Sequence, residues 1–195
     1  FRNTIAPGGN LIVADVGNAD QDELTIVEAG TDLRNLGWAL REGNVILSPG
    51  DVPGYHAPDL VYGHDEGAAT IGGFVYRGNA VPELAGHYVF GDQVSGNVWA
   101  IRYEGGAFIG DKVLLGNIPS LVSFGETPEG ELLATQYSFG EATIYRFASD
   151  ALAPVPEPAS WSLMIAGFAL LGGALRRRSD GQAARRVVCT IQARA

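Results

Sequence analysis

One short unit recurs three times in the first three quarters of the chain. In each copy a glycine precedes an apolar run that ends in a polar residue, at residues 9–15, 86–92 and 130–136. After a loop, each copy continues with a second run, at residues 23–27, 97–101 and 142–147. Short apolar runs bounded by glycine turns are typical of β-strands. The repetition therefore restricts residues 1–148 to an all-β architecture built from copies of one small antiparallel unit.

The spacing of the copies favours a β-propeller. The second and third copies begin 44 residues apart, which matches a blade repeat of about 40–45 residues. The first copy begins 77 residues before the second, and the proline-containing segment 43–67 between them is predicted to be a long surface loop. A closed propeller needs about 4–8 blades. We therefore predict a partial propeller of about three blades over residues 1–148, the C-terminal part of a larger ring; an ordinary antiparallel sandwich is the alternative.

The charge of this region argues against a nucleic-acid partner. Residues 1–150 carry 7 Lys or Arg against 20 Asp or Glu, and the whole chain has a formal net charge of −9. Such a surface repels a phosphate backbone. The single cysteine, Cys189, has no partner for a disulfide within the chain.

The last 45 residues have a different character. We expect residues 149–158 to form a proline-rich extended linker, residues 159–178 a transmembrane helix with its basic cluster, and residues 179–195 a disordered tail. The uncharged stretch 159–175 is 17 residues long, which spans about 25 Å as a helix. A buried core helix is the alternative, but such a helix is not expected to be apolar on every side and to end in three arginines.

The C-terminal segment contains a proline–glutamate–proline motif, an apolar span and a basic cluster, in that order. The residues of the motif and of the cluster are Val155, Pro156, Glu157, Pro158, Arg176, Arg177 and Arg178. This arrangement resembles the PEP-CTERM sorting signal of Gram-negative bacteria. It implies export, anchoring in the inner membrane with the propeller in the periplasm, recognition by an exosortase, and a final place at the cell surface or outside the cell. The positive-inside rule independently places the arginines in the cytoplasm.

A distinctive Gly-Gly-Phe-Val-Tyr-Arg-Gly run lies at residues 72–78. Further distinctive stretches are residues 1–3, 14–18, 22–24, 35–38, 42–43, 64–67, 84–92, 123–126 and 130–132. With these stretches, residues 1–147 resemble the glucose/sorbosone dehydrogenase family, soluble quinoprotein sugar dehydrogenases with a six-bladed propeller, and the run at 72–78 is the most specific match.

The family resemblance implies where a cofactor and a metal would bind. Arg2 and Asn3 stand where the family contacts pyrroloquinoline quinone (PQQ), a tricarboxylate that a guanidinium group can hold with two hydrogen bonds. Backbone carbonyls of Gly17 and Asn18 stand where the family holds calcium, a cation that prefers oxygen ligands. The family's catalytic histidine falls before Phe1, so no catalytic residue is assigned in this chain.

Other chemistry-bearing residues give weaker signals. His56, His64 and His87 are spaced by 8 and 23 residues, which matches no zinc motif. The acid pairs at 22–23 and 65–66 are predicted to be solvated loop charges; calcium binding by loops at the face of a propeller is the alternative.

Two functions follow as hypotheses. The first is a fragment of an exported PQQ-dependent dehydrogenase that oxidises an aldose or sorbosone in the full-length protein. The second is a non-catalytic extracellular propeller that binds partners or exopolysaccharide. The fold alone does not separate them.

Overall fold

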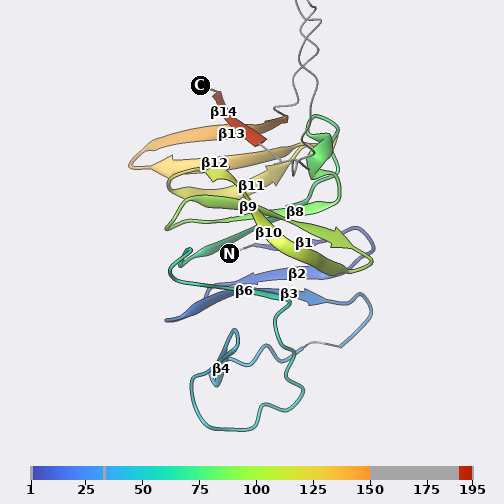
Figure 1. Cartoon of the computed structure of the whole chain (residues 1–195), viewed down its shortest axis with the longest axis vertical. Helices are drawn as coiled ribbons and strands as arrows, with labels where there is room; N and C mark the ends of the chain where they lie inside the picture. Colours follow the sequence, from blue (N-terminus) through green and yellow to red (C-terminus); the bar gives the residue numbers. More distant parts are fainter. Residues whose placement is uncertain (1, 33, 150–188, 195) are drawn as a thin grey trace, which may run out of the picture. The chain divides into compact units, whose positions relative to one another are not determined.

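The computed structural model describes residues 2–32, 34–149 and 189–194. This part of the chain forms three separate four-stranded antiparallel sheets (Figure 1). The first sheet has the order β1 (Asn3–Ile5), β2 (Leu11–Asp15), β3 (Gln21–Val27) and β6 (Leu60–Gly63). The second has β7 (Thr70–Val75), β8 (His87–Asp92), β9 (Asn97–Glu104) and β10 (Ala107–Asn117). The third has β11 (Leu121–Glu126), β12 (Leu132–Ser138), β13 (Glu141–Ser149) and β14 (Cys189–Arg194).

Two smaller elements complete the described secondary structure. A short hairpin of β4 (Arg41–Glu42) and β5 (Val45–Ile46) lies in the connection between β3 and β6. A single 3₁₀ turn, η1 (Pro82–Leu84), connects β7 to β8.

The three copies of the repeat occupy equivalent places. The first runs lie in β2, β8 and β12, each the second strand of its own sheet, and the second runs lie in β3, β9 and β13, each the third strand. Leu11 pairs with Val27 and Tyr88 pairs with Ile101 in the corresponding hairpins. The prediction of about three consecutive all-β units is confirmed, because the repeats fall in three sheets rather than in one.

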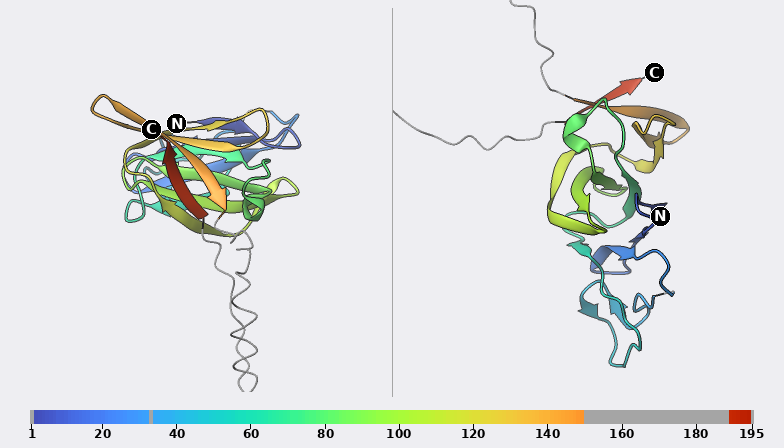
Figure 2. Two further views of the ribbon diagram at one scale, coloured as in Figure 1. Left: turned by 90° about the horizontal axis from the view of Figure 1, so that it is seen from above. Right: turned by 90° about the vertical axis from the view of Figure 1, so that its right-hand side faces the viewer.

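Each pair of neighbouring sheets encloses its own apolar core. Ile12, Leu24 and Phe90 belong to the core between the first and second sheets. Val89 and Leu121 belong to the core between the second and third. Since successive side chains of a strand point to opposite faces, β8 buries residues on both sides. The right-hand view of Figure 2 shows the three sheets following one another in the order blue, green and orange.

The first strands of the sheets are neighbours as well. β7 contacts both β1 and β11, so the innermost strands of the three sheets line up side by side. This is the arrangement in which a propeller's first strands surround its axis.

Two sequence expectations differ from the structure. The segment 43–67 is not wholly a loop, because Leu60–Gly63 supplies the fourth strand of the first sheet and pairs with β3. The apolar residues that follow the last proline of this segment complete the sheet. The tail 179–195 was expected to be disordered, but its described part forms β14 along β13. The physical reason is that the edge of β13 presents unpaired backbone groups that a further strand can satisfy.

The predicted membrane helix lies outside the described residues, together with the linker beyond Ser149 and the sorting motif. In the part that the structure describes, no helix is long and apolar enough to cross a membrane.

Candidate functional site

Arg2 lies where the innermost strands of the three sheets meet. Its Nη1 donates hydrogen bonds to the carbonyl oxygen of Phe124 at 2.5 Å and to Oγ of Ser123 at 3.2 Å. Its guanidinium carbon lies 4.6 Å from the ring centroid of Phe74. Arg2 therefore connects β1 to β7 and β11, while Asn3 beside it is exposed.

A small cavity beside Arg2 is lined by charges of both signs. Its volume is about 170 Å³, and its lining includes Arg2, Asn3, Phe74, Arg77 and Glu126. The Arg77 guanidinium donates two hydrogen bonds to the Glu126 carboxylate. One runs from Nε to Oε1 at 3.0 Å and the other from Nη2 to Oε2. These hydrogen bonds raise the pKa of Arg77 further above its ordinary value.

This cavity does not fit PQQ. Pockets for ligands of cofactor size usually have volumes of about 300–1,000 Å³, and the cavity is smaller. The guanidinium of Arg2 is also already hydrogen-bonded to β11. The cavity at Arg2 is therefore too small to hold the quinone as it stands.

Gly17 and Asn18 lie at the same edge of the first sheet as Arg2. Asn3 pairs with Val13, so the start of β1 is beside the end of β2, from which the loop 16–20 continues. Gly17 is half-buried, and Asn18 is exposed. The structure thus brings the predicted pair Arg2–Asn3 and the predicted pair Gly17–Asn18 to one edge of the sheet, although 14 positions separate Asn3 from Gly17 in the sequence.

A buried carboxylate that the sequence analysis did not single out holds this loop. Oε1 of Glu42 accepts backbone hydrogen bonds from Ala19 at 2.8 Å, Asp20 at 2.6 Å and Gln21 at 3.0 Å. Burial raises the pKa of Glu42, but the hydrogen bonds from the loop outweigh burial, so the net pKa is lowered. A signal was present in the sequence, because Glu42 belongs to one of the stretches that match the family.

Acidic side chains crowd the same edge. Asp15 and Glu23 are direct cross-strand partners. Burial, together with the charges of Asp15, Glu42 and Asp22, raises the pKa of Glu23 to about 7. Oε2 of Glu23 and Oε2 of Glu42 are buried and have no hydrogen-bond partner.

These residues fit a calcium ion in their chemistry. The neighbouring carboxylates and the unpaired Oε2 of Glu23 favour a nearby cation. The available ligand atoms are carboxylate and carbonyl oxygens, which calcium prefers. Across residues 2–32, 34–149 and 189–194, no group of three or more His, Cys, Asp or Glu side chains is placed to hold a metal. A calcium ion here would therefore need backbone carbonyl oxygens among its ligands.

The acid pair at 22–23 was wrongly predicted to be solvated. Asp22 is completely buried. It is the second residue of β3, which lies between β2 and β6, and its side chain faces the second sheet. Its Oδ2 accepts hydrogen bonds from the Thr70 backbone at 2.6 Å and from the Tyr62 hydroxyl at 3.1 Å. The Tyr62 hydroxyl also lies 3.2 Å from Oδ2 of Asp92, which is equally buried. This bridge connects the first two sheets.

The three histidines lie in different settings. His64 Nε2 is 3.5 Å from Oδ1 of Asp22, and His56 Nε2 is 3.2 Å from the carbonyl oxygen of Ile26. His87 begins β8.

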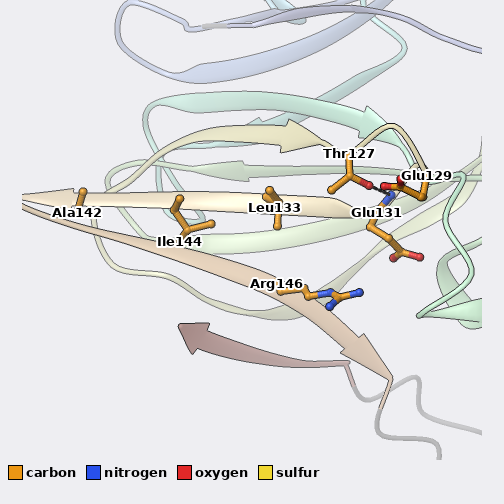
Figure 3. A pocket seen from close by; sticks show the side chains of 7 residues that line it. All are labelled: Thr127, Glu129, Glu131, Leu133, Ala142, Ile144 and Arg146. Carbon is orange, nitrogen blue, oxygen red and sulfur yellow. Dashed lines mark hydrogen bonds between the residues drawn. The ribbon is translucent and has the colours of Figure 1, made fainter. Parts of the chain in front are cut away.

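A larger hollow, of about 840 Å³, lies on the third sheet (Figure 3). Its apolar part is formed by Leu133, Ala142 and Ile144, and charged side chains, including Glu131 and Arg146, lie at one end. Leu133 is flanked in β12 by Leu132 and Ala134, which are both buried in the core toward the second sheet. The hollow therefore lies on the opposite face, which no described sheet covers, and none of the predicted site residues lines it.

Comparisons with known proteins agree with this architecture. The Glucose / Sorbosone dehydrogenase family model matches residues 3–141, and the PEP-CTERM protein-sorting motif matches residues 154–178. The HIPL1 protein of Arabidopsis thaliana is 28% identical over 177 residues, which cover 78% of this chain and 25% of that protein. The HIPL2 protein of the same plant is 32% identical over 104 residues, covering 46% of this chain and 14% of that protein.

Solved structures show the same fold. The PQQ-bound aldose sugar dehydrogenase of Streptomyces coelicolor is similar with a TM-score of 0.55 and 18% identity, over 73% of this chain and 40% of that one. A glucose dehydrogenase is similar with a TM-score of 0.54 and 20% identity, over 68% of this chain and 39% of that one. The chain thus spans about a quarter or less of the curated relatives and about two fifths of the solved structures.

Proposed function

We propose that this chain, which belongs to the Glucose / Sorbosone dehydrogenase family, is part of an exported PQQ-dependent sugar dehydrogenase that is sorted to the cell surface. In the full-length protein the reaction would be the oxidation of an aldose or of sorbosone. The observation that carries the proposal is the family match over three consecutive four-stranded sheets, followed directly by a sorting motif.

The chain's own residues would contribute binding groups rather than a base. Arg2, with Asn3, would bind a carboxylate of the quinone, and the carbonyls of Gly17 and Asn18 would bind calcium. The bound quinone would supply the two-electron acceptor for the sugar. The chain spans only about two fifths of the solved structures that it matches, which supports the view that further blades complete the quinone pocket.

The sorting function would reside in the segment matched to the PEP-CTERM motif. An exosortase would recognise the motif at residues 155–158. The apolar span would cross the inner membrane and keep the sheets in the periplasm, with Arg176, Arg177 and Arg178 remaining in the cytoplasm. After processing, the protein would reach the cell surface or the medium.

A non-catalytic propeller that binds partners or exopolysaccharide is the second candidate. The observation that favours it is the engagement of Arg2 by the β11 backbone, which leaves a cavity too small for a quinone. The two functions are separated by supplying the full-length protein with PQQ and calcium and measuring dye reduction with a panel of aldoses. Sugar-dependent reduction supports the dehydrogenase, and its absence together with saccharide binding supports the second function.

A further inference from the structure

The loop between β2 and β3 is organised around one oxygen atom. Three consecutive backbone N–H groups, those of residues 19, 20 and 21, point to Oε1 of Glu42. Glu42 lies more than 20 positions away in sequence and is 4% exposed. Successive N–H groups that converge on one anion form a backbone nest.

The nest also determines where the carbonyl groups point. The peptide bonds of this loop are trans, and in a trans peptide the N–H and the C=O of one unit point in opposite directions. The N–H of Ala19 belongs to the same peptide unit as the C=O of Asn18. Since that N–H points to Glu42, the carbonyl of Asn18 points away from it.

Gly17 lies so close to the Glu42 carboxylate that no side chain fits at this position. A Cβ added at Gly17 would lie 1.9 Å from the carbonyl oxygen of Gln21 and 2.5 Å from Oε1 of Glu42. The backbone N–H of Gly17 is fixed separately by Oδ1 of Asp22 at 2.9 Å. The backbone N–H of Asn18, which shares its peptide unit with the C=O of Gly17, also donates a hydrogen bond to Glu42. The carbonyl of Gly17 therefore points away from Glu42 as well.

We propose that Glu42 is a positioning residue that aims the carbonyl oxygens of Gly17 and Asn18 at a calcium ion without binding the ion itself. This inference rests on the proposed function, because the calcium site belongs to that proposal. Removing a group that hydrogen-bonds to a metal's ligands and orients them usually lowers metal affinity by about 10- to 100-fold.

The test compares E42A and E42Q in the 195-residue chain. E42A removes the acceptor, whereas E42Q keeps an amide oxygen at the place of Oε1. E131A is the matched control, because Glu131 also accepts two backbone hydrogen bonds, from Asn79 at 2.8 Å and Ala80 at 2.9 Å, but holds a different loop. Two quantities are measured for each protein: amide hydrogen exchange at residues 19–21 without calcium, and the Kd for calcium by titration calorimetry.

We expect E42A to accelerate exchange at residues 19–21 and to weaken calcium binding by about tenfold or more. E42Q is expected to stay within about threefold of the wild-type Kd, and E131A to equal the wild type in both quantities. Unchanged calcium binding by E42A would overturn the role of Glu42 but not the proposed calcium site. A loss in E42Q as large as in E42A would overturn it as well, because Glu42 would then act through its charge. Absence of calcium binding by the wild type would remove the proposed calcium site and this role with it.

Discussion

The bridge between the first two sheets offers a sharp test of how they are joined. The Tyr62 hydroxyl lies 3.1 Å from Oδ2 of Asp22 and 3.2 Å from Oδ2 of Asp92, and both carboxylates are fully buried. Tyr62→Phe removes this hydroxyl alone. The ring is retained, with its centroid 5.1 Å from that of Trp99, so the variant creates little empty space.

The expected cost follows from the chemistry of the contact. A hydroxyl has one proton and therefore donates to one carboxylate at a time. A hydrogen bond to a charged group contributes about 1.5–3 kcal/mol. The two carboxylate oxygens also keep backbone donors, from Thr70 at 2.6 Å and from Ala69 at 2.7 Å. The lower half of the range, about 1.5–2 kcal/mol, is therefore expected, which lowers Tm by about 3–8 °C in a protein of this size.

The assay is thermal unfolding followed by circular dichroism, with Tyr145→Phe as the control. Tyr145 donates to a neutral acceptor, Oε1 of Gln136 at 2.7 Å, and is only half-buried. Its loss is expected to cost about 0.5–1.5 kcal/mol. A Tm of Tyr62→Phe equal to that of the wild type would refute the argument that the hydroxyl joins the sheets through buried charge.

Three further predictions concern the acidic edge and the sorting segment. The pKa of Glu23 is raised from 4.5 to about 7, so between these pH values the native state holds a proton that the unfolded state releases. The free energy of unfolding is therefore expected to fall as pH rises through this range. Glu23→Gln should flatten this pH dependence. Gly17→Ala places a Cβ 1.9 Å from the carbonyl oxygen of Gln21 and should lower the free energy of unfolding by about 1–3 kcal/mol. In the control Gly125→Ala, the added Cβ lies 3.9 Å from its nearest neighbour, so this variant should be tolerated. Thermal unfolding of both variants measures the difference. Alanines at residues 156–158 should block C-terminal processing without blocking export, and an unchanged mass of the mature protein would contradict the sorting assignment.

The repeat in the sequence predicted the two central strands of each sheet. Glycine turns and apolar runs depend on local geometry, so the equivalence of β2, β8 and β12 was visible without any tertiary information. The fourth strand of the first sheet was missed because the prolines before Leu60 suggested a continuous loop. The pairing of β6 with β3 depends on contacts between residues more than 30 positions apart, which a local pattern does not contain.

The candidate site was predicted only in part. Arg2, Asn3, Gly17 and Asn18 were named from the family resemblance, and the structure places them at one edge of the first sheet. Glu42 was missed as a site residue. It lies in a stretch that matches the family, but that match does not distinguish a carboxylate that holds a distant loop from a solvated one. The burial of Asp22 was missed because the donors to its Oδ2 come from the second sheet and from β6, which are distant in sequence.

Arg2 is proposed to belong to a quinone site that is completed in the full-length protein. The direct measurement is the Kd for PQQ, in the presence of calcium, of the full-length protein and of its Arg2→Ala and Arg2→Lys variants. The wild type is expected to bind PQQ. Arg2→Ala should bind about ten- to a hundredfold more weakly, because a charged, two-point contact is lost, and Arg2→Lys, which keeps only the charge, should lie between them. Equal affinities in all three proteins, at unchanged Tm, would remove Arg2 from the site, and no binding to the wild type would contradict the dehydrogenase assignment itself.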